Sequence, residues 1–583
     1  MLAVAASAGA WVAQPGLLPI GALVVVVAWS VGRPWMLVVG VALLTSGLAA
    51  HATAGLAIEP GEWRGTVEVV RVATTSTGDV HAEVRAGERH LDLVAPDHAR
   101  ASVLGAHPGD RLAVSGRISP GDPATARGRG NHIAGRLYPE HLAPGGRPRL
   151  LWRIAGEVRT GAQALGRPLS SSQQALFEGF VLGDASGQTA VQRADFRASG
   201  LTHLLVASGE NVAFVLLLAA PVLLRCGLRT RWALTIGLCV LYALVTGLEP
   251  SVLRASTMAV VATTAAGLGR PARSWRTLAY AVTVLVIADP FLVHSSAFGL
   301  SVGASVGILA LARPLVAVAP GPLWLRRPLA VTVAAQIGVA PLLLGFPGGM
   351  PVAAVPANLL AAVPAGLVMV LGLPALLVVA SGLPGSGILL WVPRMLLGFV
   401  DAVARQTASL GLGYLGGVMV VVATVGIGVV LVVGRERLAW LRRGGYLLAV
   451  LGLGAPILLG APPGTGANGG SGPVVLRRGG TVVVVLTGEV PAESLLTDLS
   501  IARVRRVDLV VVPHGGDADA AMVETIGHRH PIGRIVTPDR LAAPGRPQTV
   551  VAAGQRVRSG GAIVEVVATD PVLSVHVVAD GRS

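Results

Sequence analysis

Apolar runs long enough to enter a lipid bilayer recur along most of this chain of 583 residues. Because a spanning helix needs about 20 apolar residues, the N-terminal part predicts two helices, over 17–31 and 35–50, with a weaker one before Pro15. This pattern predicts a polytopic α-helical membrane protein with about 10–12 spans. The later apolar runs cover residues 204–224, 232–248, 252–268, 278–293, 298–312, 329–344, 352–380, 413–433 and 446–459.

Residues 51–165 interrupt the apolar series with a different pattern. From Gly61 onward apolar and polar residues alternate, and Gly and Asp mark turns, which predicts a small β-barrel. The stretch GDRLAVSG at 109–116 is typical of a strand that follows a turn in a compact barrel such as an OB-fold. The segment lacks the aromatic platform on which OB-folds stack single-stranded bases. We therefore expect an OB-like barrel with a structural or docking role.

Charge adds an orientation to the predicted spans. All 46 basic residues are arginine, and they cluster in loops beside apolar runs, where retention on the cytoplasmic side explains the net charge of +15 without a nucleic-acid ligand. With Arg33 inside and the turns at Glu249 and Asp289 outside, residues 51–165 and the C-terminal part both lie outside. The arginine clusters that can be placed inside lie at 225–231, 270–276, 326–327 and 435–443.

One region does not fit simple alternation of sides. Between Pro351 and Arg435 the chain must start outside and finish inside, whereas spans over 352–380 and 413–433 alone would return it to its starting side. Either the Pro-rich PVAAVPANLLAAVPAG stretch enters and returns, or residues 387–410 cross despite their charges. Because residues 387–410 are amphipathic, we expect them to lie in the membrane interface.

The segment SGLTHLLVASGENVAFVLLL combines polar side chains with an apolar run. Within it His203, Glu210 and Asn211 fall on one stripe of a helix, and Ser208 with Gly209 marks a break. Polar groups at membrane depth face protein or a water-filled lumen, so one interpretation is a stripe that faces a cavity. The alternative is a helix start at the interface, with Ser208 and Asn211 capping the span that follows.

Further polar residues favour a solute pathway. Arg254 lies about one turn into an apolar run and needs a partner, a lumen or headgroups; we expect Glu249 or Glu210 as its partner. Asn358 lies between two prolines, where it places an amide beside a broken helix. Simple small-residue packing is expected for Ser295, Ser296 and Ser301.

The order of these segments and their residues resemble the ComEC family of competence proteins. The family's strongest sequence motif is similar to Gly183-Asp184, Phe196, the run from Ser199 to Leu205, and Ser208-Gly209. Where the family commonly has Leu-His-Val, this chain has Glu210-Asn211-Val212, so a role that needs a histidine there does not carry over. Further agreement comes from residues 247–255, from Asp289-Pro290 followed by Gly299-Leu300-Ser301, and from Asn358-Leu359-Leu360.

From Gly472 the chain alternates short strands and turns. A strand at 507–512 that ends in a His-rich loop resembles the place where metallo-β-lactamase-like hydrolases hold their metals. Two metals need a cluster of several ligands, and here only His514 matches, with Asp517 and Asp519 nearby. His528 and His530 are expected to be solvent-exposed. We therefore expect a degenerate α/β or β-rich hydrolase-like domain without metal, cofactor or catalytic residues.

The resemblance implies a cell-membrane channel that imports single-stranded DNA during natural transformation. It implies membrane lipid and a DNA-receptor protein outside as partners. It also implies a cytoplasmic helicase or ATPase, since no GxxxxGK[ST] phosphate loop occurs in the chain. Formation of a homo-oligomer is left as an open alternative. The alternative is a membrane-anchored metal-dependent hydrolase or nuclease, and a small-solute transporter is a third hypothesis without a repeat to support it.

The expected parts are N-terminal helices at 1–50, an external OB-like domain at 51–165, a competence-type transmembrane domain with interfacial helices at 166–461, and an external hydrolase-like domain at 472–583.

Overall fold

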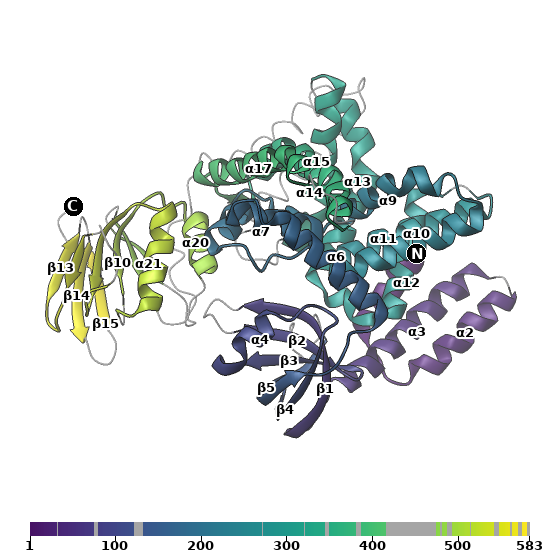
Figure 1. Cartoon of the computed structure of the whole chain (residues 1–583), viewed down its shortest axis with the longest axis horizontal. Helices are drawn as coiled ribbons and strands as arrows, with labels where there is room; N and C mark the ends of the chain where they lie inside the picture. The colour runs from purple at the N-terminus through teal and green to yellow at the C-terminus, as the bar shows by residue number, and fades with distance from the viewer. Residues whose placement is uncertain are drawn as a thin grey trace.

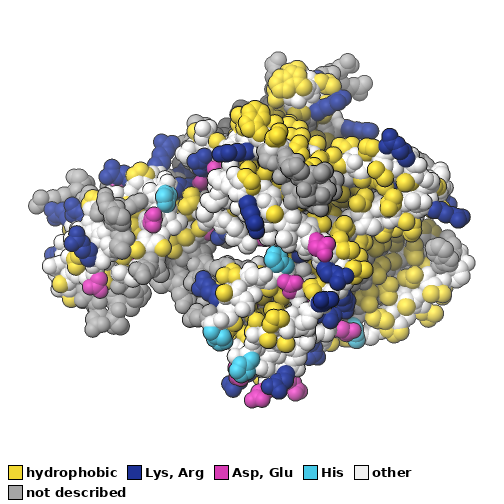
Figure 2. All heavy atoms as spheres, viewed as in Figure 1, with side chains coloured by type: hydrophobic (Ala, Val, Ile, Leu, Met, Phe, Trp, Pro, Cys, Tyr) yellow, Lys and Arg dark blue, Asp and Glu magenta, His cyan; other side chains and the backbone are white. Residues whose placement is uncertain are grey.

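The computed structural model places a helical body between a β-barrel and a C-terminal α/β domain (Figure 1). Hydrophobic side chains spread over α2, α3 and the top of the helical body, whereas the barrel carries charged and histidine side chains (Figure 2). The structure describes residues 1–31, 33–74, 80–121, 132–270, 272–319, 321–343, 349–380, 386–415, 474–478, 481–486, 492–512, 515–541, 547–559, 562–568 and 574–579.

Three N-terminal helices pack through glycines. They are α1 (Leu2–Val12), α2 (Leu17–Val31) and α3 (Pro34–Gly55). A Cβ added to Gly21 or Gly47 would lie 2.2 Å from backbone nitrogens of the facing helix, and one added to Gly9 would lie 2.1 Å from the Ala42 oxygen. Small residues allow this close approach of helices in lipid. The two clear helices expected in this region are present.

The expected small barrel is present. It closes in the order β1-β2-β3-β5-β4, with β3 parallel to β5 and the other pairs antiparallel. The alternation of apolar and polar residues explains why the barrel forms. Strand β4 buries every second side chain in its first half and so supplies one wall of the barrel core. The elements are β1 (Gly61–Thr74), β2 (Val80–Ala86), β3 (Arg89–Ala95), η1 (Asp97–Ala99), α4 (Arg100–Leu104), β4 (Arg111–Pro120) and β5 (Ile133–Pro144).

The barrel is fixed to the helical body by apolar and polar contacts. Its buried core includes Leu56 from the end of α3 and Phe291 from a turn far along the chain. His132 lies 3.1 Å from Asp289 in that same turn. Arg159 lies in the helix after the barrel, α6 (Leu150–Gly166). Its guanidinium donates to the backbone oxygens of Val245, at 2.8 Å, and Pro108, at 3.1 Å. Burial lowers the pKa of Arg159 to about 10, against the opposing charges of Asp184 and Asp110, so its guanidinium stays charged at neutral pH.

The helical body contains most of the apolar helices. In the described part of the chain, four helices are long and apolar enough to cross a membrane, at Pro34–Gly55, Leu228–Val245, Ser296–Val318 and Ala354–Leu376, and shorter apolar helices accompany them. The number of about 10–12 spans remains a prediction. The elements are α6 (Leu150–Gly166), α7 (Ser171–Leu182), α8 (Ala190–Ala198), η2 (Thr202–Leu204), α9 (Gly209–Leu223), α10 (Leu228–Val245), α11 (Pro250–Gly267), α12 (Ser274–Ala288), η3 (Pro290–His294), α13 (Ser296–Val318), α14 (Leu323–Leu343), α15 (Ala354–Ala380), α16 (Ser386–Leu389) and α17 (Trp391–Ser409).

Helix α17 runs back along α15. A two-stranded pairing of β6 (Met350–Pro351) with β7 (Tyr414–Leu415) brings the end of this hairpin beside its start. One face of α17 is buried through Leu397, Val400 and Val403, which explains its amphipathic sequence by packing within the protein. The position of residues 387–410 relative to the membrane, in the interface or across it, stays a prediction. The apolar runs at 416–473 lie outside the described residues.

The C-terminal part is an α/β domain, as expected. A five-stranded sheet in the order β12-β11-β10-β9-β8 is parallel except for β8 at its edge. Helices α20 and α21 pack on one face, and a three-stranded sheet of β13, β14 and β15 packs on the other. The elements are β8 (Val474–Arg478), β9 (Thr481–Val485), α20 (Ala492–Ile501), β10 (Val507–Val511), α21 (Asp517–Arg529), β11 (Ile532–Thr537), β12 (Gln548–Val550), β13 (Arg556–Ser559), β14 (Ala562–Ala568) and β15 (Ser574–Ala579).

Candidate functional site

The turn after α8 brings the polar segment against the start of α15. Gly200 has a φ of 74°, and a Cβ added there would lie 2.4 Å from the Ala354 Cβ. Only glycine combines this left-handed backbone with such a close approach. Ser199, fully buried, donates to the Phe196 oxygen at 3.0 Å. This turn therefore fixes where the following residues meet α15.

Asn211 is a structural anchor at the end of α7. Its amide donates to the Phe180 backbone oxygen at 2.8 Å and accepts from the Ser208 hydroxyl at 3.0 Å. The Tyr242 hydroxyl donates to the next oxygen, that of Val181, at 3.3 Å. Because the last carbonyls of a helix lack partners within it, these two side chains complete the end of α7. Asn211 is 7% exposed, so it is a satisfied core amide.

The expected single stripe of His203, Glu210 and Asn211 does not form. His203 lies in the short 3₁₀ turn η2, and α9 begins only at Gly209 with Ser208 as its N-cap residue. The break therefore divides the stripe, and within α9 Glu210 is exposed while Asn211 is buried. Ser208 therefore occupies the N-cap position that the alternative predicted. Its side chain, however, accepts no capping hydrogen bond from the helix.

His203 meets Asn358 across the gap to α15. The two side chains interact, and the Asn358 amide also donates to the Ala354 oxygen at 2.8 Å. Asn358 is 7% exposed. The structure thus brings together two predicted site residues that lie far apart in the sequence. Their contact lies beside the turn at Gly200.

A small hollow separates the start of α9 from the middle of α15. Its volume is about 20 Å³, which is room for one water molecule and far too little for a nucleotide. The hollow therefore cannot hold a strand in this conformation. It is lined by Phe180, Leu204, Val206, Ser208, Glu210, Asn211, Phe214, Ala362, Ala365, Gly366 and Met369.

Arg254 lies behind this hollow, at the amino end of α9. Its Nε donates to the Ser301 hydroxyl on α13 at 2.9 Å, and Nη1 lies 3.2 Å from the Met258 sulfur. A Cβ added to Gly209 would lie 2.7 Å from Nη2, so glycine allows the guanidinium to reach the helix end. In the described part of the chain no carboxylate lies within 4.0 Å of this guanidinium.

Glu249 is not the partner of Arg254. It pairs with Arg71 of the barrel at 2.5 Å, and the Glu249 side chain is only 11% exposed. Burial raises the pKa of its carboxyl, with Arg71 lowering it and Glu83 raising it. The expectation failed because Arg71 is 178 positions away in the sequence and no local pattern connects the two. Glu210 makes no ion pair with any described residue either, so neither carboxylate compensates the charge of Arg254.

The C-terminal domain docks on α8 through ion pairs. Arg193 and Arg197 hold Glu493 of α20 at 2.8 and 2.9 Å. Asp195 lies 3.2 Å from Arg529, and both side chains are about nine-tenths buried, at 8% and 10% exposed. Burial raises the pKa of Asp195 to about 6, while Arg529 lowers it. The signal in the sequence was the alternation of charge along α8, but it did not reveal a partner.

The expected hydrolase ligands are only partly described. His514 and the side chain of Asp517 lie outside the described residues, and Asp519 accepts from the Gly515 N–H at 3.1 Å. Within the described ranges, no group of three or more His, Cys, Asp or Glu could hold a metal ion. His528 is exposed as expected, whereas His530 is 5% exposed, which corrects the expectation for it. Desolvation lowers the pKa of His530 to about 4.

The sequence did not point to Arg71, Tyr242 or Arg529, and it predicted only a packing role for Ser301, which accepts a hydrogen bond from Arg254. Each acts through a partner on a distant element, which the local pattern could not show. Comparison with protein families matches residues 180–437 to a family described as "Competence protein". No curated protein and no solved structure matches the chain. Residues 180–437 therefore match the competence protein family, which confirms the predicted likeness of this region to ComEC and supports a role in DNA uptake.

Proposed function

We propose that this protein is a channel in the cytoplasmic membrane that imports single-stranded DNA. The observation that carries the proposal is Arg254, a guanidinium inside the helical body without a carboxylate partner among the described residues. It lies against the amino end of α9, where the helix dipole adds further positive potential. Such a place attracts the phosphates of a strand without a matching acid to compete for the arginine.

The small volume of the hollow near Arg254 supports a gated channel. Its size admits a water molecule only, so conduction requires α9 and α15 to separate. The contacts that would have to change are Asn211 to the end of α7 and His203 to Asn358. Driving this change needs a partner, and we propose a cytoplasmic helicase or ATPase as the motor and an external DNA-receptor protein that delivers the strand.

The positions of the two soluble parts support an outer location for both. The barrel contacts the turns at Glu249 and Asp289, which the charge pattern places outside. The C-terminal domain contacts the turn at 411–413 beside Pro351, also placed outside. The five-stranded closed barrel supports an OB-fold, and the α/β domain supports a degenerate hydrolase-like domain retained for docking.

Substitution of Arg254 tests the channel. Arg254→Gln keeps a donor for Ser301 but removes the charge, Arg254→Lys keeps the charge, and Arg313→Gln removes an exposed arginine from α13 as a matched control. Labelled DNA bound at the surface and labelled DNA that reaches the cytosol are measured separately in a transformable host. We expect Arg254→Gln to lose import at least tenfold with surface binding intact, and Arg254→Lys and Arg313→Gln to keep it. Normal import by Arg254→Gln would contradict the proposal.

A further inference from the structure

A second basic site lies at the junction between the C-terminal domain and the helical body. A cavity of about 210 Å³ opens there, which is room for on the order of ten water molecules. One wall comes from the end of α17 and the turn before β7, the other from the turn after α20 and the end of α21. This cavity is about ten times larger than the hollow beside Arg254.

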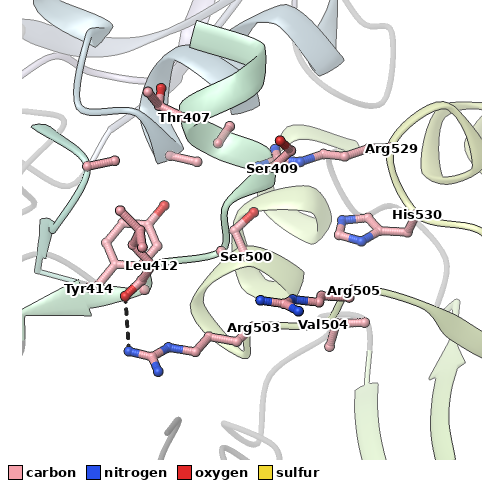
Figure 3. Close-up of a pocket in the computed structure, with 15 residues that line it drawn as sticks. Thr407, Ser409, Leu412, Tyr414, Ser500, Arg503, Val504, Arg505, Arg529 and His530 are labelled. Carbon is pink, nitrogen blue, oxygen red and sulfur yellow. Dashed lines mark hydrogen bonds between the residues drawn. The ribbon is translucent and has the colours of Figure 1, made fainter. Parts of the chain in front are cut away.

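Three arginines from the C-terminal domain contribute positive charge to the walls. Arg503, Arg505 and Arg529 all line the cavity. Figure 3 shows the labelled side chains placed around one space, with Arg503 joined to the Leu412 oxygen by the hydrogen bond of 3.1 Å. Arg505 is exposed, so it remains available to a ligand that arrives from solvent. Hydroxyls of Thr407, Ser409 and Ser500 complete the polar lining.

Several buried polar atoms at this cavity lack hydrogen-bond partners. The Tyr414 hydroxyl and Nη1 of Arg529 are among them. Nη1 is paired electrostatically with Asp195 at 3.2 Å, but that contact lacks hydrogen-bond geometry. Buried donors without a partner are rare and costly. An oxyanion in the cavity offers acceptors to both.

The backbone conformation of Arg503, which lines the same cavity, is also unusual. Its φ is 51°, a left-handed conformation that costs a non-glycine residue free energy. The conformation turns the chain after α20 so that Arg503 lies across Gly413, where an added Cβ would come within 2.3 Å of Nε. The turn thus holds a guanidinium at the cavity wall despite its strain.

The cavity is separate from the degenerate hydrolase site. Residues 503–505 and 529–530 precede the parallel strands β10 and β11, whereas the loop with His514 and Asp519 follows β10. The two places therefore lie at opposite ends of the same strands. The acidic groups near the cavity are Asp195, which pairs with Arg529, and Asp498, whose charge acts on Tyr414.

We propose that this cavity binds a backbone phosphate of the single strand that is being imported. The inference rests on the proposed function for the identity of the strand, and on the arginines and unpaired donors for the phosphate. Arginine suits this task because its planar donors match phosphate oxygens. A contact here would guide the strand along the outer surface of the helical body.

Binding of a fluorescein-labelled oligothymidylate to the full chain in nanodiscs tests the proposal. Arg503→Gly removes the guanidinium and suits the positive φ. Arg505→Gln removes an exposed charge whose side chain makes no hydrogen bond or ion pair with the described residues. Arg534→Gln, an exposed arginine of β11 outside the cavity, is the matched control. We expect each cavity variant to bind on the order of tenfold more weakly, and the slope of log affinity against log salt to fall by about 0.7. The control should keep both values.

Two results would overturn the proposal. One is an equal loss in Arg505→Gln and Arg534→Gln, which would mean that only overall charge matters. The other is an unchanged affinity for the oligothymidylate in both Arg503→Gly and Arg505→Gln. The outcome is independent of the channel test, because strand binding at this cavity can persist when Arg254→Gln has lost import.

Discussion

Arg529 and Asp195 give a sharp test of how the C-terminal domain is held. The carboxylate is 8% exposed and the guanidinium 10% exposed, so removing one partner leaves a buried charge uncompensated, which costs about 3–5 kcal/mol. Arg529→Ala should therefore loosen the docking of α20 on α8 by that amount at pH 7.5. Replacing Asp195 by Asn in the same chain removes the stranded charge and should recover most of the loss.

The pH dependence has a definite sign. The pKa of Asp195 is about 6 in the folded protein, raised by burial from 3.8, so the folded state binds the extra proton between these two values. Docking is therefore stronger below pH 4 and weakens as the pH rises through 6. At about 1.4 kcal/mol per pKa unit the change is roughly 3 kcal/mol. Asp401 and Arg405 on α17 act on the carboxyl in opposite directions.

Hydrogen exchange of α8 and α20 in the full-length protein measures this docking. Amide protection in these helices, corrected for the intrinsic pH dependence of exchange, should change on the order of a hundredfold for 3 kcal/mol. Asp195→Asn should abolish the pH dependence, although it leaves the buried Arg529 without its partner. Loosening by the double variant Arg529→Ala with Asp195→Asn as large as that by Arg529→Ala alone at pH 7.5 would contradict this account, as would a wild-type protein whose protection is the same at pH 7.5 and pH 5.

Three further outcomes are expected. Arg71→Ala should weaken docking of the barrel by about 1 kcal/mol, since Arg71 is half exposed, and Glu249→Gln in the same chain should reverse the loss; exchange protection of β1 measures both. Gly200→Ala should cost about 1–3 kcal/mol because it combines a positive φ with a clash against Ala354; the thermal midpoint in detergent measures it, and an unchanged midpoint would contradict the close packing of this turn. His514→Ala should leave DNA import unchanged, and a large loss of import would revive the hydrolase alternative.

Local periodicity predicted the parts whose causes are local. The alternation after Gly61 predicted the barrel, and the strand at 507–512 predicted β10, because side chains alternate between two faces of a sheet. The break at Ser208 and Gly209 was also readable from the sequence. In each case the residues that decide the structure are neighbours along the chain.

Pairings between distant elements could not be predicted in this way. Glu249 was expected beside Arg254 because the two are close in sequence, yet it contacts Arg71 of the barrel. Asn211 was expected either to face a cavity or to cap the start of a helix, and only the position of α7 shows that it satisfies the end of that helix. The burial of His530 depends on the contact between two domains. Each of these depends on how elements are arranged, which hydrophobic pattern alone does not encode.

The place of Phe291 in the barrel core has a consequence for biosynthesis. The last barrel strand ends at Pro144, but the core remains incomplete until Phe291 has been made. At about 5–20 residues per second, the roughly 150 residues between them take on the order of ten to thirty seconds. During this interval the nascent barrel lacks Phe291, so its core reaches the final packing only after the helices between residues 144 and 291 have been synthesised.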